Sequence, residues 1–177
     1  MRLRVAAKMN EEILVQQLRA RLQGVFALYN RLLLVVGTAG CGKTGALRRF
    51  AELESCPMLN LGMELSPLLL DLTERQRVLQ LPRLLDEIAS KAGRPLLALD
   101  NTEILFTVAL QQDPLRLLQG LSRNCTIVAS WFGTINGGEL IHAVPNHPEF
   151  RRYPIRDLSF VEAGPQGLDS NCWDKEP

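Results

Sequence analysis

The sequence predicts an α/β fold in which helices flank a parallel sheet. Three short, mostly apolar runs carry this prediction, at residues 32–36, 96–100 and 125–131. Each run is shorter than an ordinary buried helix, and apolar residues follow one another without alternation, as in strands covered on both faces. Helical stretches separate the runs. Such alternation is typical of a parallel sheet with right-handed crossovers.

The first half of the chain supplies four further elements in order. Residues 9–29 predict a helix, because apolar side chains recur at i, i+4 spacing and Asn10 is a suitable cap before Glu11 and Glu12. The strand at 32–36 follows. We then expect a helix at 45–53, a strand at 58–61 and a helix at 63–71.

The second half is divided by proline and glycine. Residues 73–77 predict a polar turn or a short helical turn, and Pro82 at a first helical position then opens a helix to about Lys91. After the strand at 96–100, residues 103–106 begin a short helix. Asp113 as cap and Pro114 in the first turn predict a helix over 114–122. Residues 140–144 are a candidate last strand.

Length and composition predict a single domain. The chain has 177 residues and a formal net charge of +1, so no global basic field favours nucleic acid. We expect one domain over residues 1–157 with the N-terminal helix at 9–29, and a flexible tail over 158–177. No apolar run reaches the roughly 18 residues of a membrane span, and no signal peptide is recognisable, so a cytoplasmic protein is expected. The cysteines are isolated, which disfavours a zinc site or disulfide framework.

One motif points to a specific ligand. Gly37-x-x-x-x-Gly42-Lys43-Thr44 satisfies G-x-x-x-x-G-K-[ST] at every fixed position, between a predicted strand and a predicted helix. Glycines let backbone N–H groups turn toward phosphates, and the positive end of the next helix faces the same charge. The predicted phosphate-binding residues are Gly37, Thr38, Ala39, Gly40, Cys41, Gly42, Lys43, Thr44 and Gly45.

The motif and one later acidic residue predict binding sites for a nucleotide and a metal ion. Lys43 is expected to place its ammonium on the β- and γ-phosphates, and Thr44 to supply a hydroxyl to Mg²⁺. Asp100 ends a predicted strand and is expected to hold the same Mg²⁺, through water; the alternative is a cap for residues 102–106. The chain lacks the Asn-Lys-x-Asp motif of guanine-reading proteins. The predicted ligand is therefore ATP with Mg²⁺.

Four residues are candidates for the reaction itself. Glu103 is a candidate general base or an N3 capping residue, and Glu64 competes for the role of base. Ser130, near the carboxyl end of its strand, is a candidate contact to the γ-phosphate or the attacking water, or a simple core serine. Arg123 follows the helix at 114–122. It is either an arginine finger acting across a subunit interface or a partner of its own helix terminus.

Several runs resemble the BrxF family, small P-loop proteins of type 3 BREX (bacteriophage exclusion) systems. They are LVVGTAGCGKTGALR (34–48), NLGMELS (60–66), LDNTEILF (99–106), QDPLRLLQGLSRN (112–124) and HPEFRRY (147–153). The resemblance spans roughly residues 10–155 and does not extend to the tail after Asp157. It implies an ATPase of the additional-strand (AAA/RecA-like) class that acts beside other BREX proteins in phage defence. The family's presumed nucleotide residues correspond to residues 37–44 and Asp100.

Two functions are therefore favoured, and two remain as weaker alternatives. The first is an ATP-hydrolysing switch or assembly factor, which a homo-oligomer would suit. The second is a nucleotide-binding interaction module with little hydrolysis, favoured by Asn101 in place of an acid beside Asp100. A small-molecule kinase would need a lid carrying Arg75, Arg77 and Arg83. DNA contact would rest on the modest basic-aromatic patch in which Phe150 and Tyr153 are interleaved with Arg151, Arg152 and Arg156.

Overall fold

The computed structural model describes residues 2–93 and 95–164, and a five-stranded sheet forms its centre. Its strands run in the order β2-β3-β4-β1-β8, and every neighbouring pair is parallel. The strands are β1 (Leu32–Gly37), β2 (Met58–Asn60), β3 (Leu96–Asp100), β4 (Thr126–Phe132) and β8 (Ser159–Glu162). The predicted α/β fold with a parallel sheet is therefore confirmed. β4 lies between β1 and β3.

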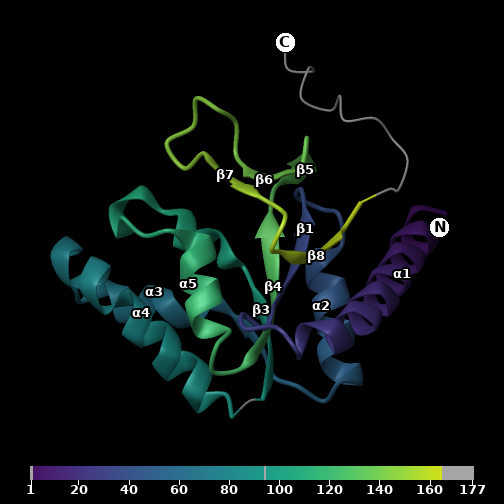
Figure 1. Cartoon of the computed structure of the whole chain (residues 1–177), viewed down its shortest axis with the longest axis horizontal. Helices are drawn as coiled ribbons and strands as arrows, with labels where there is room; N and C mark the ends of the chain where they lie inside the picture. The colour runs from purple at the N-terminus through teal and green to yellow at the C-terminus, as the bar shows by residue number, and fades with distance from the viewer. Residues whose placement is uncertain (1, 94, 165–177) are drawn as a thin grey trace.

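Helices cover both faces of this sheet (Figure 1). One face carries α1 (Arg2–Val25) and α2 (Lys43–Leu53), and the other carries α3 (Leu61–Leu70), α4 (Glu74–Lys91) and α5 (Pro114–Leu121). Side chains of β1 alternate between the two layers. Leu33 and Val35 pack with α1 and α2, whereas Leu34 and Val36 pack with α3 to α5. Burial on both faces explains why the strand reads as one continuous apolar run.

A second sheet lies beyond the carboxyl end of β4, at the top of Figure 1. Its antiparallel strands, in the order β5-β6-β7, are β5 (Thr134–Asn136), β6 (Glu139–His142) and β7 (Arg151–Pro154). Gly137 and Gly138 turn the chain between β5 and β6 with φ of 57° and 80°. The predicted strand at 140–144 is thus part of this small sheet. The short 3₁₀ helices η1 (Thr102–Phe106) and η2 (Val108–Leu110) connect β3 to α5.

Two predicted helix starts are wrong. α1 begins at Arg2 rather than at Asn10, because nothing in residues 2–9 interrupts a helix. α4 begins at Glu74, where Thr73 forms a capping box with Gln76. Pro82 therefore lies inside α4 instead of opening it.

A side chain from outside α4 compensates for the proline. Pro82 lacks the N–H that would bond the carbonyl of Val78, four residues earlier. Nε2 of Gln112 donates to that carbonyl oxygen instead, at 3.0 Å. The helix is thus continuous through a residue that usually ends or kinks one.

The predicted tail at 158–177 begins too early in the chain to be correct as a whole. β8 lies within it, pairs with β1, and places Val161 beside Val35 with 4% of its surface exposed. The central domain therefore extends past residue 157. The rest of the predicted tail, from residue 165 onward, lies outside the described residues.

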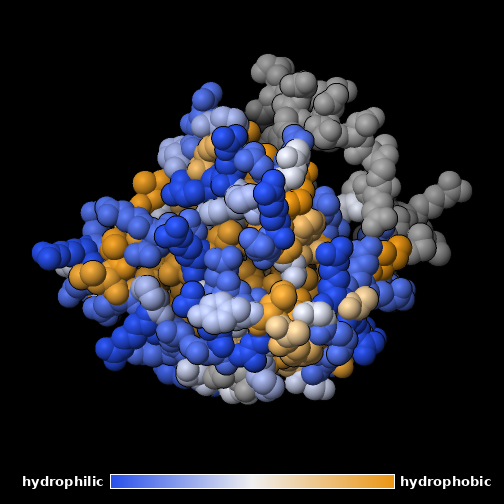
Figure 2. Space-filling view, in the orientation of Figure 1, coloured by the Kyte–Doolittle hydropathy of each residue, from blue (hydrophilic) through white to orange (hydrophobic). Residues whose placement is uncertain are grey.

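The face seen in Figure 2 is mainly hydrophilic, and one of its groups of apolar residues lies over the α3–α4 end of the molecule. The most exposed apolar side chains there are those of Met63, Leu70 and Leu79, with 73%, 75% and 70% of their surface exposed. In the ranges 2–93 and 95–164, no helix combines the length and the apolar character needed to cross a bilayer.

Candidate functional site

The loop between β1 and α2 has the backbone that the motif predicts. Gly40 and Gly42 adopt φ of 74° and 88°, which side chains rarely tolerate, and Gly42 is the N-cap residue of α2. Gly37 serves a different purpose. A Cβ there would lie 2.5 Å from the carbonyl oxygen of Ala163 and from Sγ of Cys41, so glycine permits close approach. The loop therefore lies directly at the N-terminus of α2, where anions are favoured.

Lys43 is held against this loop. Its ammonium donates to the carbonyl oxygens of Gly37 at 2.6 Å and Thr38 at 2.7 Å, and lies 3.7 Å from Sγ of Cys41. Only 9% of its surface is exposed. Its present partners are neutral carbonyls, and a charged phosphate oxygen would form a stronger hydrogen bond with it.

A cleft of about 370 Å³ brings most of the predicted site together. Its lining residues are Ala39, Gly40, Cys41, Gly42, Lys43, Thr44, Asp100, Asn101, Glu103 and Phe132. Residues far apart in the chain, from the loop, the end of β3 and η1, therefore face one space. The strand order explains this meeting, since the carboxyl ends of parallel strands share one edge of the sheet.

Asp100 and Glu103 reach the cleft by a sharp turn after β3. Asp100 is 5% exposed, and in the sheet its backbone lies opposite Asn60 of β2. Asn101 then adopts a left-handed conformation, with φ 53° and ψ 48°. Oγ1 of Thr102 donates to the carbonyl oxygen of Ser130 at 2.5 Å, which fastens η1 to β4. These two features direct Glu103, which is half-buried, toward the loop.

Ser130 lies level with this site but does not line the cleft. It pairs with Val35 on β1, is 1% exposed, and its Oγ has no hydrogen-bond partner among the described residues. A buried hydroxyl without a partner costs about 1–3 kcal/mol, so the position is suited to a ligand or a water. Strand alternation places the side chain on the face of Val128, toward α1 and α2.

Two other predicted residues lie away from the cleft. Arg123 lies at the opposite, amino-terminal edge of the sheet, where its guanidinium is 5.1 Å from the ring centroid of Tyr29 and its carbonyl accepts from Arg31. A role for Arg123 at a nucleotide would therefore need a second copy of the chain. Glu64 is exposed in the first turn of α3 and is absent from the residues lining the cleft.

Phe132 is a cleft residue that sequence reasoning missed. Its ring centroid lies 5.6 Å from Nζ of Lys43, and its carbonyl oxygen is 2.7 Å from Nδ1 of His142. His142 stacks on Phe106, at 3.6 Å between ring centroids, and burial lowers its pKa below the usual 6.5. The only available signal was the position of Phe132, immediately after a predicted strand at the carboxyl edge.

The donor chemistry of the cleft suits Mg²⁺. Thr44 offers a hydroxyl and Asp100 a carboxylate, and hard oxygen donors are the ligands this ion prefers. Within the described part of the chain, no three His, Cys, Asp or Glu residues gather as a metal site. A magnesium ion here would therefore take its other ligands from phosphate and water, as it commonly does.

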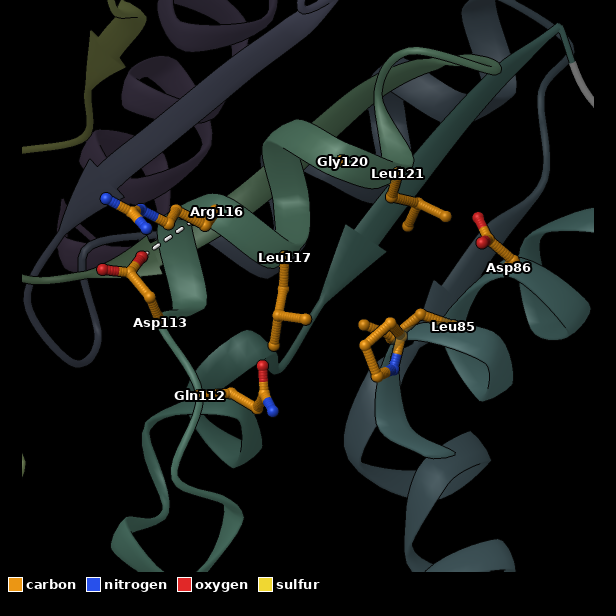
Figure 3. A pocket seen from close by; sticks show the side chains of 9 residues that line it. Leu85, Asp86, Gln112, Asp113, Arg116, Leu117, Gly120 and Leu121 are labelled. Atoms are coloured by element: carbon orange, nitrogen blue, oxygen red, sulfur yellow. Dashed lines mark hydrogen bonds between the residues drawn. The ribbon is translucent and has the colours of Figure 1, made fainter. Parts of the chain in front are cut away.

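A larger cavity, of about 450 Å³, lies elsewhere, between α4 and α5 (Figure 3). Leu85 and Asp86 line it from α4, and Gln112 and Leu117 line it from the opposite side. None of the residues predicted to bind nucleotide or metal lines it. Size alone therefore does not identify the site, whereas the phosphate loop does.

Comparisons with known proteins add little to this geometry. No protein-family model matches the sequence, and no curated protein matches it. Among solved structures, one of C. elegans PCH-2 is similar, with 16% identity and a TM-score of 0.40. The match covers 75% of this chain but only 39% of the PCH-2 chain. At this level of similarity, function has to be inferred from the residues of the cleft themselves.

Proposed function

We propose that this protein binds ATP with Mg²⁺ in the 370 Å³ cleft and hydrolyses it as a switch within a larger assembly. One observation carries the proposal: Lys43, Thr44, Asp100 and Glu103 line a single space beside a glycine-rich loop at a helix N-terminus. This is the set of groups that phosphoryl transfer needs, namely a phosphate cradle, a metal position and a carboxylate.

Each residue has a distinct task. Lys43 leaves the carbonyls of Gly37 and Thr38 and donates to the β- and γ-phosphates. Thr44 and Asp100 would hold Mg²⁺, which would neutralise phosphate charge. Glu103 accepts a proton from the attacking water. The hydroxyl of Ser130, which is buried outside the cleft lining and has no partner among the described residues, would bind a water at the same level of the sheet.

Strand order and the family resemblance support a finer assignment. The insertion of β4 between the loop strand β1 and the acid-bearing strand β3 is the arrangement of the additional-strand class of P-loop NTPases. The resemblance to BrxF proteins supports a role in bacterial phage defence beside other BREX components. We therefore place the switch in such a complex, with homo-oligomerisation as the way in which Arg123 of one copy reaches the nucleotide of another.

Two substitutions test binding and turnover separately. Lys43→Ala is expected to abolish ATP binding, because the loop loses its ammonium. Glu103→Gln is expected to leave binding within about twofold and to lower phosphate release by about 10²–10⁴-fold, the usual contribution of a general base. Calorimetric binding and phosphate release with Mg²⁺ provide the measurements, and Glu64→Gln is the matched control. Equal turnover by the Glu103→Gln and wild-type proteins would remove Glu103 from the mechanism.

A second function is favoured by Asn101. This residue stands beside Asp100 and turns the chain, so no acid directly follows the metal-binding position. The protein would then bind ATP and dock to a larger partner with little hydrolysis. Tight ATP binding without phosphate release, alone and with partner proteins or DNA, is the result that would favour this module over the switch.

A further inference from the structure

A second hollow lies on the other side of the phosphate loop. Its volume is about 310 Å³, and it lies between α1 and the carboxyl end of β8. Asn10, Ile13, Leu14 and Gln17 line it from α1, Cys41 from the loop, and the 162–164 segment from β8. We call this space the α1–β8 groove. Nothing in the function proposed above uses it.

The order of the strands gives a bound triphosphate a direction. β1, which leads into the loop, lies between β4 and β8. The metal-binding side, with Asp100 on β3, is beyond β4, whereas the groove adjoins β8. Cys41 lines both spaces, so they lie on either side of this loop residue. A nucleotide with its terminal phosphates beside Asp100 that continued past Cys41 would have its other end at the groove.

We propose that the α1–β8 groove binds the nucleoside half, the base and ribose, of the triphosphate held by the loop. This inference rests on the proposed function and extends it to the selection of the ligand. The volume falls at the lower end of the range of small-molecule sites, which suits a group of this size.

The lining of the groove has the chemistry that a base requires. Ile13, 46% exposed, and Leu14, 3% exposed, offer apolar surface to the face of a ring. Asn10 and Gln17 carry amides, which both donate and accept hydrogen bonds along the edge of a base. The groove thus combines an apolar wall with a few polar groups, as ligand sites usually do.

Glu11 follows the groove-lining Asn10 on α1 and lies against the phosphate loop. Its side chain packs on Gly42 and Gly45, and a Cβ on Gly45 would overlap Oε1 of Glu11. The absence of a side chain at Gly45 therefore allows the carboxylate of α1 to reach the N-terminus of α2. A carboxylate accepts hydrogen bonds only, so it suits the hydroxyls of a ribose and repels further phosphate. We assign Glu11 to the ribose.

The contribution of the groove is measured by comparing ATP with inorganic tripolyphosphate, which has no nucleoside. Wild-type protein is expected to bind ATP more tightly. The double variant Ile13→Ser with Gln17→Ala is expected to lower the affinity for ATP by about tenfold and to leave the affinity for tripolyphosphate unchanged. Gln16→Ala with Gln23→Ala, exposed on the same helix, is the control and should bind both ligands as wild type does.

Three results would count against this part of the proposal in distinguishable ways. Equal wild-type affinity for ATP and tripolyphosphate would mean that the nucleoside contributes nothing. An equal loss of affinity for ATP and tripolyphosphate in the double variant would mean that the groove residues affect the phosphate loop and do not contact the base. Failure of wild-type protein to bind either ligand would instead overturn the proposed function.

The role of Glu11 is tested with 2′,3′-dideoxy-ATP. Wild-type protein is expected to favour ATP over this analogue by roughly tenfold, the value of one charged hydrogen bond. Glu11→Ala should remove that preference, whereas Glu12→Ala, exposed beside it, should keep it. If Glu11→Ala raises the affinity for ATP, for its dideoxy analogue and for tripolyphosphate by the same factor, then Glu11 only repels phosphate and the ribose assignment is wrong.

Discussion

At the scale of single residues, His142 links the small sheet to the wall of the cleft. It stacks on Phe106, and because the carbonyl oxygen of Phe132 can only accept, Nδ1 of His142 carries the proton of their hydrogen bond. Burial is the main cause of its lowered pKa, opposed by that carbonyl and by the carboxylates of Glu149 and Glu103. His142 is therefore neutral in the folded protein under conditions where an unfolded chain would protonate it.

This shift predicts a dependence of stability on pH. Below the ordinary pKa of 6.5, the unfolded chain binds a proton that folded His142 does not, so the free energy of unfolding falls as pH falls. The slope from this group is at most about 1.4 kcal/mol per pH unit. Urea unfolding at about pH 7.5 and about pH 5.5 should show a smaller loss for His142→Gln than for wild type. His147→Gln, which changes the exposed histidine, should keep the wild-type loss.

Residue-level prediction depends on how local the chemistry is. The loop at 37–44 needs only its own glycines, lysine and threonine, so the sequence identifies it directly. The orientation of Glu103 depends on the left-handed turn at Asn101 and on the bond from Thr102 to β4, neither of which has a sequence signature. Phe132 was missed for the same reason, because its role arises only when β4 lies beside β1.

At the scale of elements, α4 shows how one long-range bond preserves a helix. Gln112→Ala would leave the carbonyl of Val78 without the donor that Pro82 cannot supply, at a cost of about 1 kcal/mol in unfolding free energy. The cost should shrink in a Pro82→Ala background, where residue 82 donates to Val78 itself. Chemical denaturation of the four proteins in this cycle provides the coupling energy. The same cost in both backgrounds would show that Gln112 acts by some other contact.

The strands that could be predicted from the sequence are those buried on both faces. β1, β3 and β4 were predicted because strands covered on both faces are continuously apolar. β8 has only Phe160 and Val161 as apolar residues and was assigned to a tail. α5 was predicted closely, since Asp113 and Pro114 mark its start by local chemistry. Thr73 marks the start of α4 by the same kind of local chemistry, and Pro82 lies inside that helix.

At the scale of the whole molecule, β8 is the edge strand of the central sheet beside β1, although the sequence predicts a tail at these residues. Val161 is buried among residues of α1, α2 and β1, although it lies only a few residues from the end of the described chain. Val161→Asp is expected to cost roughly 3 kcal/mol or more of unfolding free energy, because it buries an unpaired charge. Glu162→Ala, exposed next to it, should be nearly neutral. Thermal or urea unfolding compares them, and a neutral Val161→Asp would mean that β8 contributes little to the fold.

The strand order could not be read from the sequence. Continuous apolar runs identify strands but do not say which strands are neighbours, and several orders satisfy the rule for right-handed crossovers. The three-stranded sheet of β5, β6 and β7 was also hidden, because its short, half-exposed strands carry no strong pattern. The sequence therefore predicted the layers of the molecule and the loop at its centre, and the arrangement around that loop came from the structure.

The α1–β8 groove joins the first helix of the chain to the last strand that the structure describes. A ligand seated there would contact both α1 and the segment after β8, so its binding would favour the state in which these two elements are packed together. Ligand binding would then stabilise the folded state, and this stabilisation would grow with ligand concentration. In cells, a protein built in this way would lose its resistance to proteolysis as its nucleotide became scarce.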